Sequence, residues 1–279
     1  MKILFLKHNI LILLFFLCLV DSCNTVQRDT KGHLVIVGGG IEHTPEILKK
    51  FVDLAGGSEA RIAIITMASE DYLAAGEYYT MEFKALGAQQ AKTFHIKDSI
   101  AANSDSVVAN LEDYNSFFFG GGDQNRLTKI FLNSEALKVM HRKYSTGSVL
   151  GGNSAGAAIM SRIMLTGEGN WTVLSKDSVD LSEGFGFVTE AIIDQHFIER
   201  RRFNRLLAAT IEFRKTGIGI DQETAVWIKP NSDIEVLGNG VVLVIRPDHA
   251  KFPKQFQNGL LNVKNLELDI YRSGEIFRF

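Results

Sequence analysis

Cysteine is almost absent from this 279-residue chain: the sequence holds two, Cys18 and Cys23, and both fall in its first 23 residues. The rest of the chain contains no thiol, which excludes a cysteine nucleophile, cysteine metal ligands and a fold that depends on disulfides. An excess of one charge sign is lacking too, because the formal net charge is −2. Such a chain has no electrostatic footprint for nucleic acid.

Motifs for metals and nucleotides are also missing. The seven histidines are scattered, with no H-x-x-x-H spacing and no paired carboxylates, so we expect no metal. The glycine-rich segments match neither G-x-x-x-x-G-K-[ST] nor G-x-G-x-x-G, so we expect no nucleotide cofactor. No internal repeat or low-complexity linker interrupts the chain, which favours one large domain.

The first 23 residues predict a signal peptide. Lys2 and Lys7 give the chain a positively charged start. They precede an apolar run over 10–20 that is too short to span a membrane readily. Cys23 follows a small residue at the expected cleavage point, which resembles a bacterial lipoprotein site with Cys23 as the lipidated first residue. Asp21 is unusual there, so plain secretion and a retained signal anchor stay open. We expect an exported protein that meets the membrane only through this lipid anchor, with a tether over 24–32 and a catalytic domain over 33–279.

From residue 33 onward, short apolar segments alternate with helix-like segments. Continuous apolar strands separated by helices predict an α/β fold with a mostly parallel sheet that is covered on both faces. Gly238-Asn239-Gly240 lies between segments 233–237 and 241–245, which predicts a C-terminal antiparallel hairpin. Other strands are expected over 34–37, 61–66, 92–96, 116–119, 148–150, 192–193, 217–220, 224–228 and 266–271, and helices over 45–51, 74–86, 125–143 and 197–213.

The segment 151–157 carries the first chemical signal. Ser154 stands between Gly152 and Gly156 after a short apolar run, which is the nucleophile-elbow pattern G-x-S-x-G. Flanking glycines relieve crowding at a sharp strand-to-helix turn, and the amide of Ala155 then lies at a helix N-terminus, where it can donate to an oxyanion. A glycine-rich turn without catalytic function has the same pattern, so the motif alone is weak.

A serine nucleophile needs a base, and His196 follows a predicted strand within D-Q-H. Arg200, Arg202 and Arg205 come next and cannot share one helix face, which suits a loop that converges on a carboxylate. The alternatives are an ordinary histidine and a solvated cationic helix face. The segment 120–124 also follows a strand and offers further amide donors. Because functional groups gather at the carboxyl ends of strands in open α/β sheets, we expect these segments to form one site.

The chain contains four motifs that resemble those of the cyanophycinases and occur in the same order. The cyanophycinases belong to the serine peptidase family that also includes the α-aspartyl dipeptidases. The resemblance implies a three-layer α/β/α sandwich of the class I glutamine-amidotransferase type. It also implies hydrolysis of the β-aspartyl-arginine linkages of cyanophycin to β-Asp-Arg dipeptides through an acyl-enzyme. The motifs are G-G-D-Q at 121–124, G-x-S-A-G-A at 152–157, D-Q-H-F-x-x-R-x-R-x-x-R-L at 194–206 and G-I-G-I-D at 217–221.

The same resemblance implies roles for particular residues. Ser154 would be the nucleophile and His196 the base. The acid is expected between them, with Glu168 as first choice and Asp177 and Asp180 as alternatives, whereas Asp194 is too near His196 in sequence and is expected to organise the motif. The oxyanion hole would use the amides of Ala155, Gly122 and Asp123, and the substrate pocket would be lined by Gln124, Gln195, Arg200, Arg202 and Arg205.

Three other functions fit part of this pattern. An exported peptidase for small aspartyl or isoaspartyl peptides would keep the mechanism and change the substrate. An α/β-hydrolase lipase or esterase usually places its histidine much later, where only His249 is available. A membrane-anchored binding protein would capture anionic peptides without catalysis, against which the intact Ser154 and His196 argue. The sequence leaves a homodimer open.

Overall fold

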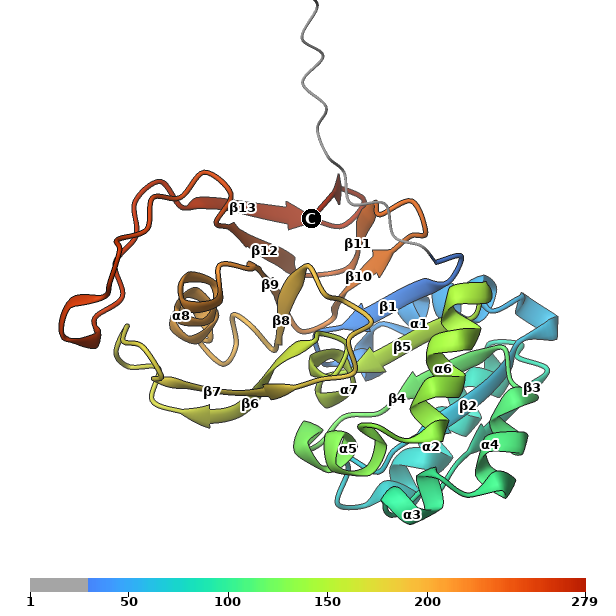
Figure 1. Ribbon diagram of the computed structural model, residues 1–279. Helices are drawn as coiled ribbons and strands as arrows, with labels where there is room; N and C mark the ends of the chain where they lie inside the picture. The colour runs from blue at the N-terminus through green and yellow to red at the C-terminus, as the bar shows by residue number, and fades with distance from the viewer. Residues whose placement is uncertain (1–29) are drawn as a thin grey trace, which may run out of the picture.

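The computed structural model describes residues 30–279 and is built around an eight-stranded mixed sheet (Figure 1). The strand order is β14-β11-β10-β1-β5-β4-β2-β3. Its parallel part consists of β1 (His33–Val37), β5 (Val149–Asn153), β4 (Ser116–Phe119), β2 (Arg61–Ile65) and β3 (Gln90–Thr93). Three antiparallel strands extend it, namely β10 (Thr224–Ile228), β11 (Ile234–Gly238) and β14 (Ile276–Phe277).

Helices bury both faces of the parallel strands, which confirms the predicted three-layer arrangement. Successive side chains of a strand point to opposite faces. Phe117 and Phe119 therefore enter one apolar cluster, while Phe118 packs edge-on against Phe51 and Phe83 in the other. The second cluster contains α1 (Pro45–Leu54) and α2 (Tyr72–Ala85), and the first contains α3 (Ser99–Ala102), α4 (Asp105–Glu112), α5 (Gln124–Phe131), α6 (Glu135–Thr146) and α7 (Ala155–Ala158).

A second sheet forms after residue 190 and carries its own helix (Figure 1). Its order is β13-β12-β9-β8, in which β8 (Ala191–Gln195) and β9 (Thr216–Ile220) are parallel. β12 (Val241–Arg246) and β13 (Glu267–Arg272) continue it antiparallel, and β6 (Ile163–Gly169) and β7 (Val179–Glu183) form a separate pair. Helix α8 (Phe203–Phe213) shares an apolar cluster with this sheet through Leu206 and Ala209.

Three expectations about the elements need correction. The helix expected over 125–143 is two helices, because Asn133 adopts φ 63° and Ser134 caps α6 by accepting from the Leu137 amide at 3.2 Å. The helix expected from 197 begins at Phe203, after a series of turns. The segments 233–237 and 241–245 do not pair, because β11 and β12 belong to different sheets. Instead, β11 pairs antiparallel with β10 and β14, and β12 pairs antiparallel with β9 and β13.

Hydrogen bonds explain why the 238–240 turn does not close a hairpin. The Asn239 amide donates to Glu223 O at 2.8 Å, and the Gly240 amide donates to Thr224 Oγ1 at 2.8 Å. Both bonds tie the turn to the start of β10, so the chain passes from one sheet into the other.

The predicted signal peptide over 1–23 and lipid attachment at Cys23 lie outside the described residues and stay predictions. Part of the predicted tether is packed, because Thr30 Oγ1 donates to Tyr144 O at 2.8 Å and the Lys31 amide donates to Ser145 O at 3.2 Å. From residue 30 to the end, no helix has both the length and the apolar character needed to span a bilayer.

Candidate active site

Ser154 occupies the sharp turn between β5 and α7. Its backbone has φ 56° and ψ −106°, and its amide donates to Val37 O at 3.0 Å. A Cβ on Gly152 would lie 2.2 Å from Gly156 O, and a Cβ on Gly156 would lie 2.2 Å from Phe119 O. Both glycines are therefore needed for close backbone approach, as the elbow pattern requires. A non-glycine residue at positive φ is uncommon and often marks a functional position.

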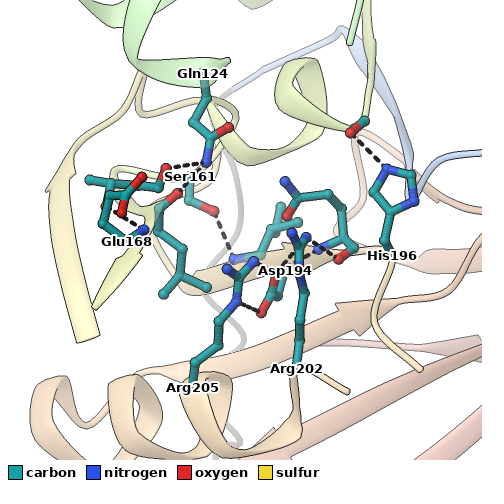
Figure 2. A network of polar contacts seen from close by, with 12 residues as sticks. Gln124, Ser161, Glu168, Asp194, His196, Arg202 and Arg205 are labelled. Carbon is teal, nitrogen blue, oxygen red and sulfur yellow. Dashed lines mark hydrogen bonds and ion pairs between the residues drawn. The ribbon is translucent and has the colours of Figure 1, made fainter. Parts of the chain in front are cut away.

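His196 lies beside this serine, with 2.8 Å between Ser154 Oγ and His196 Nε2 (Figure 2). The histidine directly follows β8 with φ 47°, and its amide donates to Gly38 O at 2.7 Å. Gly39 packs against the imidazole so tightly that a Cβ there would lie 2.1 Å from Cε1. The glycine triplet after the first strand is thus part of the site, which the sequence analysis missed although three glycines after a strand were visible.

The surroundings keep the imidazole neutral. Burial, followed by the cations Arg200 and Arg202, lowers the pKa of His196 to about 4, and Glu199 opposes them. At neutral pH the ring is therefore unprotonated, and Nε2 can accept the serine proton if the ring hydrogen is on Nδ1. Nδ1 is buried and has no hydrogen-bond partner among residues 30–279.

The structure does not bring Glu168 to His196, and this corrects the choice of the triad acid. Glu168 is exposed on β6, where its amide donates to Thr166 Oγ1 at 3.3 Å, and Figure 2 places it across the polar network from His196. Neither alternative acid is bonded to the histidine: Asp177 is exposed, and Asp180 accepts from Thr166 on the neighbouring strand. The physical reason is that these three acids lie on or beside the β6–β7 pair, whose strands are hydrogen-bonded to each other and not to β8.

Acidic residues from the end of β9 lie nearer the histidine. Asp221 hydrogen-bonds Glu199, and burial followed by this contact raises the pKa of Asp221 to about 6. Glu223 donates its amide to Gly39 O at 2.8 Å and, like Ser154 and His196, has a positive φ, here 55°. A left-handed glutamate beside the glycine that touches the imidazole is a better candidate acid than Glu168. Among the described residues, no group of three His, Cys, Asp or Glu is placed to hold a metal ion.

Two of the three predicted oxyanion donors are available. Ala155 is the first residue of α7, so its amide has no acceptor within the helix. The Gly122 amide makes no backbone hydrogen bond within residues 30–279, and a Cβ on its neighbour Gly121 would lie 3.4 Å from Ser154 Cβ. The Asp123 amide is not available, because it donates to Ala68 O at 2.9 Å, which corrects that assignment.

Arg205 forms a buried ion pair and does not face a substrate. Its guanidinium donates to both carboxylate oxygens of Asp194, and the side chains of the pair are 1% and 0% exposed (Figure 2). Asp194 also accepts from the Gln195 amide at 2.8 Å, so it organises the segment that leads to His196, as expected. The substrate-binding role predicted for Arg205 is therefore corrected to a structural one.

The other predicted pocket residues differ in whether their polar side-chain groups are already hydrogen-bonded within the protein. Gln124 is buried, and its Nε2 donates to Leu165 O at 2.9 Å and Thr166 O at 2.7 Å, so it joins α5 to β6. Arg202 is largely buried, donates to Gln195 O at 2.6 Å, and has a pKa lowered to about 10, first by burial. Gln195 Oε1 is buried without a partner among the described residues, and the Arg200 side chain is exposed. Gln195 and Arg200 thus remain the candidates for direct substrate contact.

Known proteins resemble this chain in sequence and in fold. A cyanophycinase of Nostoc sp. is 34% identical over 255 residues, which are 89% of this chain and 86% of that protein. A cyanophycinase of Geminocystis herdmanii is 34% identical over 90% of this chain and 94% of its own length. The crystal structure of a peptidase from an acI-B1 Actinobacterium has the same fold, with a TM-score of 0.68 and 20% identity over 91% of this chain and 99% of that one.

A family model covers the segments that build the site. It is the model of peptidase family S51, and it matches residues 34–236, which include the elbow, the histidine segment and the glycine loops. A Ser–His pair at hydrogen-bond distance on an elbow is the arrangement that nucleophilic catalysis by serine requires. The chain therefore belongs to peptidase family S51 and is a serine-type peptidase.

Proposed function

We propose that this protein cleaves cyanophycin between successive β-Asp-Arg units and releases β-Asp-Arg dipeptides. The bond cut is the peptide bond of the aspartate backbone, because the dipeptide product keeps its β-aspartyl-arginine linkage. The observation that carries the proposal is the 2.8 Å contact between Ser154 Oγ and His196 Nε2 beside an exposed arginine, in a chain 34% identical to curated cyanophycinases. Each arginine side chain of this polymer has a free α-carboxylate. Arg200 is a suitable partner for that group, since a guanidinium binds carboxylates in two-pronged geometry.

The mechanism follows from the positions of the same groups. His196 Nε2 takes the proton of Ser154 Oγ as the oxygen attacks the backbone peptide carbonyl that joins two β-Asp-Arg units. The amides of Ala155 and Gly122 donate to the resulting oxyanion. The imidazolium then gives its proton to the leaving amine, and an acyl-enzyme forms. Water attacks the acyl-enzyme with His196 again as base, which regenerates Ser154 and releases the acid product.

Substrate binding should strengthen the base. Arg200 is the first cation that lowers the pKa of His196, after burial. A substrate carboxylate paired with Arg200 offsets this positive charge, so the pKa of the imidazole rises in the complex. A low pKa in the free enzyme keeps His196 unprotonated, and a higher one in the complex makes it a better proton acceptor.

The charges around His196 predict the pH dependence of the reaction. The acid limb of kcat/KM, which reports the free enzyme, is expected near pH 4, and the acid limb of kcat at a higher pH. In Arg200→Gln the limb of kcat/KM is expected to move to higher pH, because one source of repulsion on the imidazolium is gone. Arg201→Gln is the matched control, since Arg201 is exposed and does not contribute to the shift. A limb that stays in place in Arg200→Gln would contradict the electrostatic argument.

The function itself is tested with the purified protein and cyanophycin. We expect β-Asp-Arg dipeptides to accumulate, as measured by chromatography and mass spectrometry, and short β-aspartyl peptides to be cleaved less efficiently. Efficient cleavage of the short peptides with no dipeptide released from the polymer would favour an aspartyl or isoaspartyl peptidase instead. No cleavage of either substrate would overturn the proposal.

A further inference from the structure

A polar pocket lies behind the active-site glycine loop over residues 120–122. It has a volume of about 480 Å³ and opens between α2, α3 and α5. Both charge signs line it: three side chains are cationic, Lys97, Arg126 and Lys129, and two are anionic, Glu70 and Asp98. The reaction described above uses none of these residues.

The pocket is joined to the active site by backbone contacts. A Cβ on Gly122 would lie 2.1 Å from Ala68 O and 2.7 Å from the Ser69 amide nitrogen, so the glycine loop rests directly on the turn that forms one pocket wall. On its other side the same loop approaches the nucleophile, because a Cβ on Gly121 would lie 3.4 Å from Ser154 Cβ. A chain that leaves the active site across this loop therefore reaches the pocket next.

Two of the three cations are free to bind a ligand. Arg126 is held between Glu70 and Asp123, at 3.8 Å and 3.9 Å, so part of its charge is balanced. Lys97 and Lys129 are exposed, and no hydrogen bond or ion pair involves either ammonium group in the part of the chain that the structure describes. Glu70 is similarly accessible, with a side chain that is 94% exposed.

We infer that this pocket is a distal subsite for the cyanophycin chain, which binds a β-Asp-Arg unit away from the bond that is cut. The inference rests on the proposed function. Each unit carries an α-carboxylate and a guanidinium, so the lysines bind the former and Glu70 binds the latter. Tyr72, whose ring is half-buried in the pocket wall, adds a surface on which a guanidinium can stack. Asp98 caps α3 by accepting from the Ala101 amide at 2.8 Å, but the exposed carboxylate of Glu70 is unfavourable in a pocket for a simple anion.

The double variant Lys97→Gln/Lys129→Gln tests the subsite. We expect KM for the polymer to rise about 3- to 10-fold, since two exposed charge pairs are lost. The kcat value, and the kinetics on a fragment of two linked β-Asp-Arg units, should not change, because such a fragment fills only the active site. High salt should raise KM for the polymer in the parent and have less effect in the variant. Lys254→Gln is the matched control, since this exposed lysine lies between β12 and β13 and does not line the pocket.

Glu70→Gln distinguishes a zwitterionic unit from a simple anion. Loss of the guanidinium partner should raise KM for the polymer, whereas removal of a negative charge from an anion site would lower it. The subsite is wrong if Glu70→Gln lowers KM for the polymer. It is also wrong if the double variant leaves KM unchanged for both the polymer and the fragment, or raises KM equally for both. Failure of the proposed function is recognised separately, because the unaltered protein would then not cleave the polymer.

Discussion

Ser154→Ala is expected to lower kcat for cyanophycin by a factor of about 10⁴ or more, because no other group in the site can form the acyl-enzyme. The folded state should be retained, since alanine differs from serine only by the oxygen that contacts His196 Nε2. The rate is measured by dipeptide release, and folding by thermal unfolding. A serine-directed phosphonylating reagent should modify the parent at Ser154 and leave the variant unmodified.

Glu168→Gln is the control for this experiment. Glu168 is exposed and lies across the polar network from His196 (Figure 2), so its replacement should change kcat by no more than about twofold. A large loss in Glu168→Gln would mean that this glutamate does orient the histidine. Substantial activity in Ser154→Ala would exclude Ser154 as the nucleophile.

Arg205→Ala is expected to have the largest effect on stability. It leaves the fully buried carboxylate of Asp194 without its main partner, and such a change costs about 3–5 kcal/mol in the free energy of unfolding. For a domain of this size the midpoint of thermal unfolding should fall by roughly 6–20 °C. Activity should fall as well, because Asp194 holds the Gln195 amide one residue before His196.

Two variants separate this effect from a general loss of charge. Arg200→Ala removes an exposed arginine of the same segment and should change the free energy of unfolding by about 0.5 kcal/mol or less. The double variant Asp194→Leu/Arg205→Met removes both charges and should be less destabilised than the sum of its single changes. If Arg205→Ala unfolds at the temperature of the parent, the ion pair has no structural role.

Sequence patterns correctly predicted the features that depend on residues close together in the chain. The elbow around Ser154 follows from two glycines that allow close backbone approach, and in the structure a Cβ on either glycine would lie only 2.2 Å from a backbone oxygen. The parallel strands follow from apolar runs between helices, and helices cover both faces of the sheet. Motif order indicated the peptidase family, which the match to residues 34–236 shows.

The errors concern contacts between distant segments. The family resemblance implies an acid between serine and histidine in the chain, which favours Glu168, but this residue lies on β6, which pairs with β7 and not with β8. Arg205 and Arg200 belong to one sequence motif, yet one is buried on Asp194 and the other is exposed. Residues of one motif take different roles because they differ in burial and in their long-range partners. The spacing of residues in the sequence predicts neither property.

The sequence by itself indicated the serine–histidine pair and the family. A strand followed by a glycine-flanked serine can form only a narrow range of turns, and the four motifs occur in the order of the family. The tertiary structure decided everything that depends on two sheets meeting at their strand ends. It placed Gly39 against the imidazole, brought Glu223 to that glycine, and directed Arg205 to Asp194. It also set the pKa of His196 near 4, since burial and the field of the arginines exist only once the chain has folded.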